Sequence, residues 1–111
     1  MDLDFVPLDD TGLRTSEIQF GTWRFGRETE AGNVEIDEER AHDLLDAYAA
    51  HGGRYIDTAD VYGGGACEEW IGDWLADRDR ERYTIASKIY WQTREDDPNS
   101  RGTNRKNVRH R

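Results

Sequence analysis

The sequence is short of lysine, cysteine and long apolar runs, and the last two shortages exclude an internal disulfide and a membrane-spanning helix. Lys88 and Lys106 are the only lysines, against thirteen arginines. Cys67 is the only cysteine, so no disulfide can form within the chain, and a reducing, cytoplasmic location is expected. No apolar run approaches the roughly 20 residues that span a bilayer, so we expect no membrane partner.

Apolar residues are also scarce overall. They make up 35% of the 111 residues, and the mean hydropathy is −1.00. A chain of this composition has little apolar surface to bury on folding. We therefore expect either a marginal fold or a part of something larger, completed by an oligomer or by a complementary C-terminal piece.

Charge is distributed unevenly along the chain. The formal net charge is −9, and the first 77 residues carry 19 acidic against 5 basic residues, whereas residues 78–111 carry 5 acidic against 10 basic. The basic segment from Arg101 to Arg111 suggests nucleic-acid binding, but the acidic remainder repels phosphates, so no nucleic-acid partner is expected. Many acids with few lysines fit a salt-adapted surface, and an ordinary acidic protein remains the alternative.

Strand-like and helix-like segments alternate after an initial hairpin. Glycine and aspartate at residues 9–12 predict a turn between the two arms of a hairpin over residues 5–17. Strands are expected at 18–22, 54–59 and 83–89. Helices are expected between Asp37 and the stop at His51-Gly52-Gly53, at 67–75, and after Asn104, where a third helix has barely begun when the chain ends. This order predicts a parallel sheet with right-handed crossovers.

Three residues carry the predictions for the helix ends and interiors. Asp37 is expected to cap the first helix, with acidic residues in its first turn. Cys67 occupies the start of the second helix and is expected to act there as a weak cap. Gly72 weakens that helix, and we expect it to let another backbone approach.

Four short motifs resemble the N-terminal third of the aldo-keto reductases. They are Gly21-Thr22-Trp23, then IDTADVYG at residues 56–63, EEWIG at 68–72 and ASKI at 86–89. SKIYW at 87–91 with RGTNRK at 101–106 is similar to the subgroup that includes the potassium channel β subunits. The resemblance implies an α/β fold, the N-terminal portion of a (β/α)8 TIM barrel of about 250 to 350 residues with a basal β-hairpin. Residues 1–111 then hold the first three βα units, three of eight strands, with the third helix truncated.

The side chains themselves suggest proton donation. Asp57 and Lys88 are expected at the ends of neighbouring parallel strands, where the carboxylate orients the ammonium beside Tyr62. A free tyrosine, with a pKa near 10, donates poorly at pH 7 unless a nearby cation favours its phenolate. We therefore predict Asp57, Tyr62 and Lys88 as catalytic residues, with Tyr62 as the acid in an NAD(P)H-dependent reduction of aldehydes or ketones.

The resemblance also implies a cofactor and a substrate. NADP(H) is expected to contact Gly21, Thr22, Trp23 and Asp57, and mainly loops after later strands. Trp23, Tyr62 and Trp91 are predicted to line the pocket for a small carbonyl substrate, although packing is an equal alternative for the two tryptophans.

No metal ligands are predicted. The family's histidine after strand four has no counterpart here, so we expect a truncated chain with little activity alone. The alternative is a non-catalytic cofactor-binding or interaction module like the channel β subunits.

Overall fold

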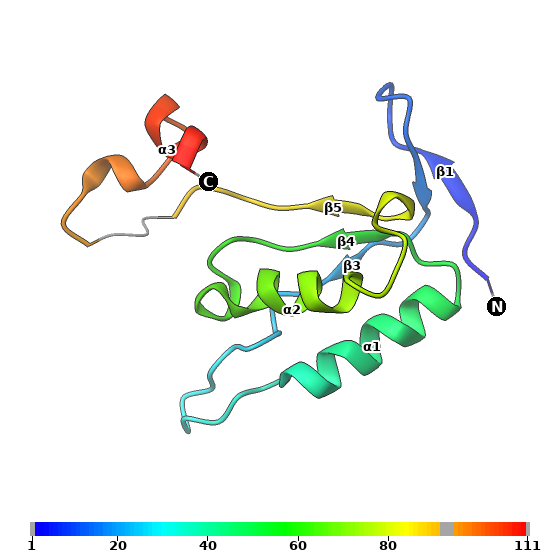
Figure 1. Ribbon diagram of the computed structural model, residues 1–111, viewed down its shortest axis with the longest axis horizontal. Coiled ribbons are helices and arrows are strands. Elements are labelled where there is room, and N and C mark those ends of the chain that lie inside the picture. The colour runs from blue at the N-terminus through cyan, green and yellow to red at the C-terminus, as the bar shows by residue number, and fades with distance from the viewer. Residues whose placement is uncertain (1, 92–94, 111) are drawn as a thin grey trace.

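A three-stranded parallel sheet forms the centre of the chain. The computed structural model describes residues 2–91 and 95–110, so Arg111, the end of the basic segment, lies outside the described residues. The strands lie in the order β3 (Phe20–Gly21), β4 (Tyr55–Asp57), β5 (Thr84–Ala86). Both connecting helices, α1 (Glu38–Ala50) and α2 (Ala66–Leu75), lie on the same side of the sheet (Figure 1). The predicted parallel alternation is therefore confirmed, as an open sheet rather than a closed barrel.

The predicted hairpin lies at the end of the sheet where the parallel strands begin. Its arms are β1 (Phe5–Pro7) and β2 (Arg14–Ser16), which pair antiparallel (Figure 1). Ser16 connects it to the sheet, since its hydroxyl accepts a hydrogen bond from the backbone N–H of Arg54 at 2.9 Å. The opposite end of the sheet, where the strands finish, is left to the loops.

The first helix begins as its sequence predicts. The Asp37 carboxylate accepts a hydrogen bond from the backbone N–H of Arg40 at 2.9 Å, which satisfies one of the free amide groups of the first turn. The helix ends at Ala50, followed by His51 as the C-cap. It buries Ala41 and Leu45 completely against the sheet and α2.

The core fills the space between the two helices and one face of the sheet. Ile56 in the central strand is fully buried, and its register partners Phe20 and Ile85 point to the same face because side chains alternate along a strand. Asp57 and Tyr55, its neighbours in β4, therefore point to the face that carries no helix among the described residues. The buried members of this core are Phe25, Ala41, Leu45, Ile56, Cys67, Ile71, Trp74, Leu75 and Tyr83.

The second helix departs from expectation at its start. A 3-10 turn, η1 (Tyr62–Gly65), leads directly into α2, and Gly65 is the N-cap. The prediction that Cys67 caps the helix is wrong, because Cys67 lies inside the helix and its side chain is fully buried. The expectation for Gly72 fails as well among the described residues: a Cβ built there would have no heavy atom within 4 Å.

The C-terminal segment extends away from the sheet beyond β5 (Figure 1). Its helix α3 (Arg105–His110) begins after Asn104, as predicted, and the carbonyl of Asn104 accepts from the N–H of Val108 at 3.0 Å. None of the helices in the described ranges combines the length and the apolar composition needed to cross a membrane.

Candidate active site

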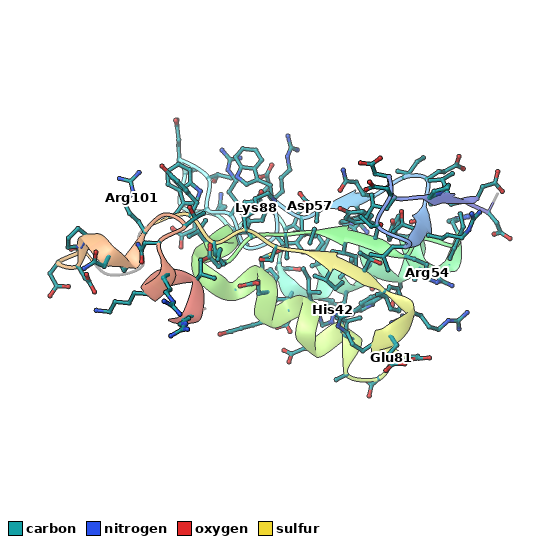
Figure 2. All side chains as sticks on the ribbon, turned by 90° about the horizontal axis from the view of Figure 1, so that it is seen from above. His42, Arg54, Asp57, Glu81, Lys88 and Arg101 are labelled. Atoms are coloured by element: carbon teal, nitrogen blue, oxygen red, sulfur yellow. The ribbon has the colours of Figure 1, made fainter. Side chains whose placement is uncertain are left out.

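Three of the predicted residues meet at the edge where the parallel strands end. Asp57 is the last residue of β4, Lys88 follows β5 by two residues, and Tyr62 opens η1. Parallel strands bring their carboxyl ends to one edge, which is where α/β folds place their ligands. Figure 2 shows Asp57 and Lys88 close together, with His42 on the helical side of the sheet.

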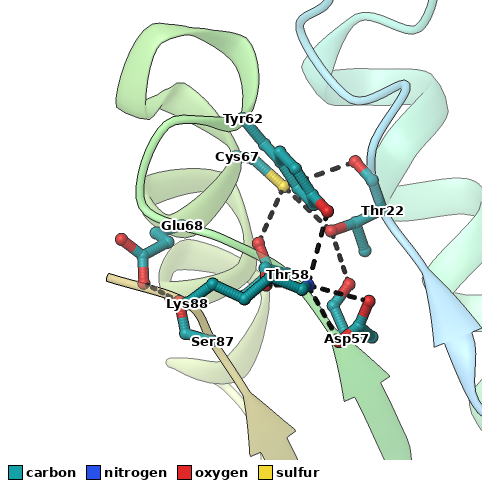
Figure 3. Close-up of polar contacts among 8 residues, drawn as sticks. All are labelled: Thr22, Asp57, Thr58, Tyr62, Cys67, Glu68, Ser87 and Lys88. Atoms are coloured by element: carbon teal, nitrogen blue, oxygen red, sulfur yellow. Dashed lines mark hydrogen bonds and ion pairs between the residues drawn. The ribbon is translucent and has the colours of Figure 1, made fainter. Parts of the chain in front are cut away.

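The Lys88 ammonium is the centre of this cluster. Its Nζ donates to both carboxylate oxygens of Asp57 at 3.1 Å, to the carbonyl oxygen of Thr58 at 2.8 Å and to the hydroxyl of Tyr62 at 3.3 Å (Figure 3). The same nitrogen lies 5.1 Å from the centre of the Tyr62 ring. One cation therefore contacts both the Asp57 carboxylate and the Tyr62 phenol, as the sequence predicts.

The surroundings of Lys88 favour its charged form. Partial burial on its own would lower the pKa of Lys88, but hydrogen bonds to Asp57 and Tyr62, together with the negative charge of Asp57, outweigh it. The net result is a pKa raised above the ordinary lysine value. The amine therefore stays protonated at neutral pH and keeps a positive charge beside the phenol.

The backbone around Lys88 is held from two sides. The N–H of Asp60 donates to the carbonyl of Lys88 at 3.3 Å, and the hydroxyl of Ser87 donates to the carboxylate of Glu68 in the first turn of α2 at 2.8 Å. Figure 3 shows this second contact beside the ammonium cluster. Sequence reasoning missed the roles of Ser87 and Glu68, although both lie in the motifs that carry the family resemblance.

A cleft opens beside the phenol. It has a volume of about 540 Å³ and is lined by Trp23, Gly26, Arg27, Glu28, Val61, Tyr62, Gly63, Gly64 and Trp91. The structure thus brings the three predicted substrate residues to one cavity, and it leaves Trp23 and Trp91 53% and 57% exposed. Tyr62 belongs both to the ammonium cluster and to the wall of this cleft, whereas Asp57 and Lys88 do not line it.

Arg27 and the glycines of η1 shape the cleft and were missed from sequence. The Arg27 guanidinium lies 4.4 Å above the Trp23 ring and 3.1 Å from the carboxylate of Glu35, which fixes its position. Gly63 has φ +62°, and a Cβ there would lie 2.7 Å from the carbonyl oxygen of Phe25. Only glycine therefore allows the two walls of the cleft to approach this closely.

The predicted cofactor residues differ in what they can offer. Gly21 has open space where a side chain would be, Trp23 is exposed, and Asp57 is partly exposed, so these three fit a ligand lying across the strand ends. Thr22 is 1% exposed, and its hydroxyl donates to the carbonyl of Asp57 at 2.9 Å. The Thr22 side chain is thus committed to the fold, which leaves only its backbone for a ligand.

Comparison with known proteins places these features in a family. Residues 17–111 match the Aldo/keto reductase family. The chain is 44% identical over 79 residues to the aldo-keto reductase ausK of Aspergillus calidoustus, which covers 70% of this chain and 20% of that protein. It is 37% identical over 78 residues to an aryl-alcohol dehydrogenase of Pestalotiopsis microspora, again covering 70% and 20%.

A solved structure agrees with the sequence matches. The holo form of the Bacillus halodurans aldo-keto reductase AKR11C1 superposes with a TM-score of 0.69 at 26% identity, covering 86% of this chain and 29% of that one. The expected fold class, part of a (β/α)8 barrel, is confirmed by this likeness. The chain spans about a fifth of the length of the two curated relatives named above.

Proposed function

The chain belongs to the aldo/keto reductase family, and on that premise we propose that its strand-end cluster donates a proton during the reduction of an aldehyde or ketone. The observation that carries the proposal is the position of Lys88 Nζ, 3.3 Å from the Tyr62 hydroxyl and 3.1 Å from both Asp57 oxygens. Tyr62 also lines the cleft, and the proposal requires a carbonyl oxygen bound there to come within reach of its hydroxyl proton.

Each residue of the cluster has a separate task. Tyr62 gives its proton to the carbonyl oxygen as negative charge develops there, a contribution typically worth about 10² to 10⁴ in rate. Lys88 stabilises the phenolate that remains, because its positive charge is held beside the oxygen. Asp57 orients the ammonium and balances its charge. A nicotinamide cofactor, when bound, supplies the hydride that completes the alcohol.

Gly21, Trp23 and Asp57, with the backbone of Thr22, are the residues of this chain that would hold the cofactor. They fit because they combine open space at Gly21, an exposed ring at Trp23 and a carboxylate at the strand end. A preference for NADP(H) and a cytoplasmic location follow what is typical of the family. The substrate we propose is a small aromatic carbonyl compound, since Trp23 and Trp91 present exposed rings to the cleft.

A chimera tests the proposal. This chain replaces the matching 29% of the Bacillus halodurans reductase, and the reduction of an aromatic aldehyde is followed through the absorbance of the reduced cofactor. Tyr62→Phe should lower the rate about 10²- to 10⁴-fold. Tyr90→Phe is the matched control, because Tyr90 is 49% exposed and its hydroxyl contacts Arg101 rather than the ammonium cluster. A Tyr62→Phe chimera that keeps its rate within threefold would remove the proposal.

The unaided chain should behave differently from the chimera. We expect weak cofactor binding and little reduction, since most of the family's cofactor loops follow later strands. A micromolar dissociation constant in a fluorescence titration of this chain would contradict that expectation. The chain matches only 20% of the length of each of the two curated relatives named above. To explain this, we propose that the chain is truncated and that a complementary C-terminal piece restores the barrel.

A second candidate function is a non-catalytic module similar to the potassium channel β subunits. The observation that favours it is the face of the sheet opposite α1 and α2, which no helix of the described residues covers (Figure 1). In such a module, an oligomer would cover this face. Its function would need neither catalysis nor a nucleic-acid or membrane partner. Sedimentation decides: a defined oligomer with a cooperative melting transition supports this module, whereas a monomer counts against it.

A further inference from the structure

Three buried polar side chains lie directly beneath the ammonium cluster. Thr22 and Thr58 are each 1% exposed and Cys67 is fully buried. They come from three elements: Thr22 follows β3, Thr58 follows β4, and Cys67 lies in the first turn of α2. Burying polar groups is costly unless they are hydrogen-bonded. The hydrogen bonds among these three side chains therefore decide whether their burial is tolerated.

The donors and acceptors of these hydrogen bonds follow a single order, from Thr58 through Cys67 and Thr22 to the Asp57 carbonyl. The Thr22 hydroxyl donates its proton to the carbonyl of Asp57 at 2.9 Å, which leaves its oxygen to accept from the Cys67 thiol at 3.1 Å. With its proton used on Thr22, the thiol must accept from the Thr58 hydroxyl, 3.2 Å away. Figure 3 shows this chain of contacts from Thr58 through Cys67 to Thr22 and Asp57.

Both ends of this chain are joined to the ammonium. The carbonyl oxygen of Thr58 accepts from Lys88 Nζ at 2.8 Å, and Asp57, whose carbonyl Thr22 holds, also binds that nitrogen through its carboxylate. The thiol therefore joins Thr58 to Thr22, whose hydroxyl and backbone N–H both donate to the carbonyl of Asp57. Burial raises the pKa of Cys67, against the opposing effect of the threonine hydroxyls, so the group remains a thiol that can donate.

We propose that Cys67 is a positioning residue for the proton-donating cluster: its thiol joins Thr58 to Thr22 and so fixes the two residues that orient Lys88 beside Tyr62. The proposal rests on the proposed function, in which the place of the Lys88 charge matters. This positioning role requires a small side chain at residue 67 that both donates and accepts a hydrogen bond. Serine meets this requirement and valine does not.

Lysine labelling reports on this position directly. Lys88 and Lys106 are the only lysines, so an amine-reactive reagent followed by peptide mass spectrometry gives the Lys88 rate relative to an internal reference. In the wild-type chain Lys88 should react slowly, because its ammonium is held by three partners. Cys67→Val should raise the Lys88 to Lys106 ratio about three- to tenfold, equal to a pKa change of half a unit to one unit.

The control variants separate positioning from packing. Cys67→Ser should keep the wild-type ratio, and Leu45→Ala, which opens a cavity elsewhere in the core, should leave it unchanged. If Cys67→Val loses its helical circular dichroism signal, Thr58→Val carries the same expectation, because it removes the hydroxyl and keeps the shape. An unchanged ratio in the folded valine variant, or an equal change in Leu45→Ala, overturns the proposal.

The two proposals fail in different ways. A lost rate in the Tyr62→Phe chimera with an unchanged labelling ratio removes the role of Cys67 and leaves the reaction standing. A retained rate in that chimera removes the reaction, and with it any catalytic purpose for the positioning, whatever the labelling shows.

Discussion

Two tyrosines hold their hydroxyl groups at opposite ends of the same parallel sheet. At the end where the strands begin, the Tyr48 hydroxyl lies 2.9 Å from that of Ser16 and 2.5 Å from the carbonyl of Ile18. It also contacts the carbonyl of Tyr55 at 2.9 Å and accepts from the N–H of Tyr55 at 3.2 Å. It thus connects the hairpin, α1 and β4.

At the other end, Tyr62 has a different kind of partner. Its hydroxyl lies 3.3 Å from the Lys88 ammonium, and the residue lines the cleft. Both tyrosines are half-buried, so exposure does not distinguish them. The difference lies in their partners: backbone carbonyls accept from the Tyr48 hydroxyl, whereas an ammonium lies beside the Tyr62 hydroxyl. The Tyr48 hydroxyl joins elements of the fold, and the Tyr62 hydroxyl belongs to the cluster for which we propose proton donation.

The largest expected effect tests the first end of the sheet. A Cβ at Gly53 would lie 2.4 Å from ring atoms of Tyr48, so Gly53→Ala must displace that ring and its hydrogen bonds. We expect a loss of about 3 kcal/mol in the free energy of unfolding by urea. Gly72→Ala is the control, since open space surrounds that position and alanine should stabilise α2 by up to about 1 kcal/mol. Equal effects at both glycines would contradict the tight packing described here.

Removing the Tyr48 and Tyr62 hydroxyls in separate variants tests directly whether the two ends of the sheet differ. Tyr48→Phe leaves the Ser16 hydroxyl and the Tyr55 N–H without the oxygen they contact, and we expect a loss of about 2 kcal/mol in the free energy of unfolding. Tyr62→Phe removes one long contact with an exposed ammonium, so its effect should lie within about 0.5 kcal/mol. The comparison breaks if Tyr62→Phe proves the more destabilising of the two in urea melts.

The meeting of Asp57, Tyr62 and Lys88 could be predicted because it follows from local rules. Strands that alternate with helices are parallel, and their carboxyl ends share an edge, so residues at the ends of successive strands converge whatever the details of packing. The Asp37 cap could be read for a similar reason, since a cap depends only on a residue and the next turn of backbone. Whether the converging residues act as proposed is left to the chimera.

The rest depended on contacts that are distant in sequence. Nothing near Tyr48 in the sequence shows that the hairpin brings Ser16 to its hydroxyl. Cys67 does not cap α2 because Gly65, the last of three glycines with positive φ, takes the N-cap position two residues earlier. The strands were expected to be longer than β3, β4 and β5, whose pairing covers only two or three residues each.

The smallest expected effect is the pH dependence of the Lys88 contacts. The pKa of Lys88 is raised above its unfolded value, which lies near 10.4, so its contribution to stability is fully present below that pH and is lost as the pH rises through the higher folded pKa. Since the side chain is 49% exposed, solvent screens the interaction, and we expect only about 0.5 kcal/mol. Urea unfolding of the wild type and Lys88→Gln should therefore differ at pH 9 and converge as the pH rises through the folded pKa of Lys88. Lys106→Gln, an exposed lysine in α3 outside the cluster, should follow the wild type throughout. A Lys88→Gln difference that stays constant as the pH rises would show that the variant loses packing of the lysine stem rather than its charge, and would contradict this pH dependence.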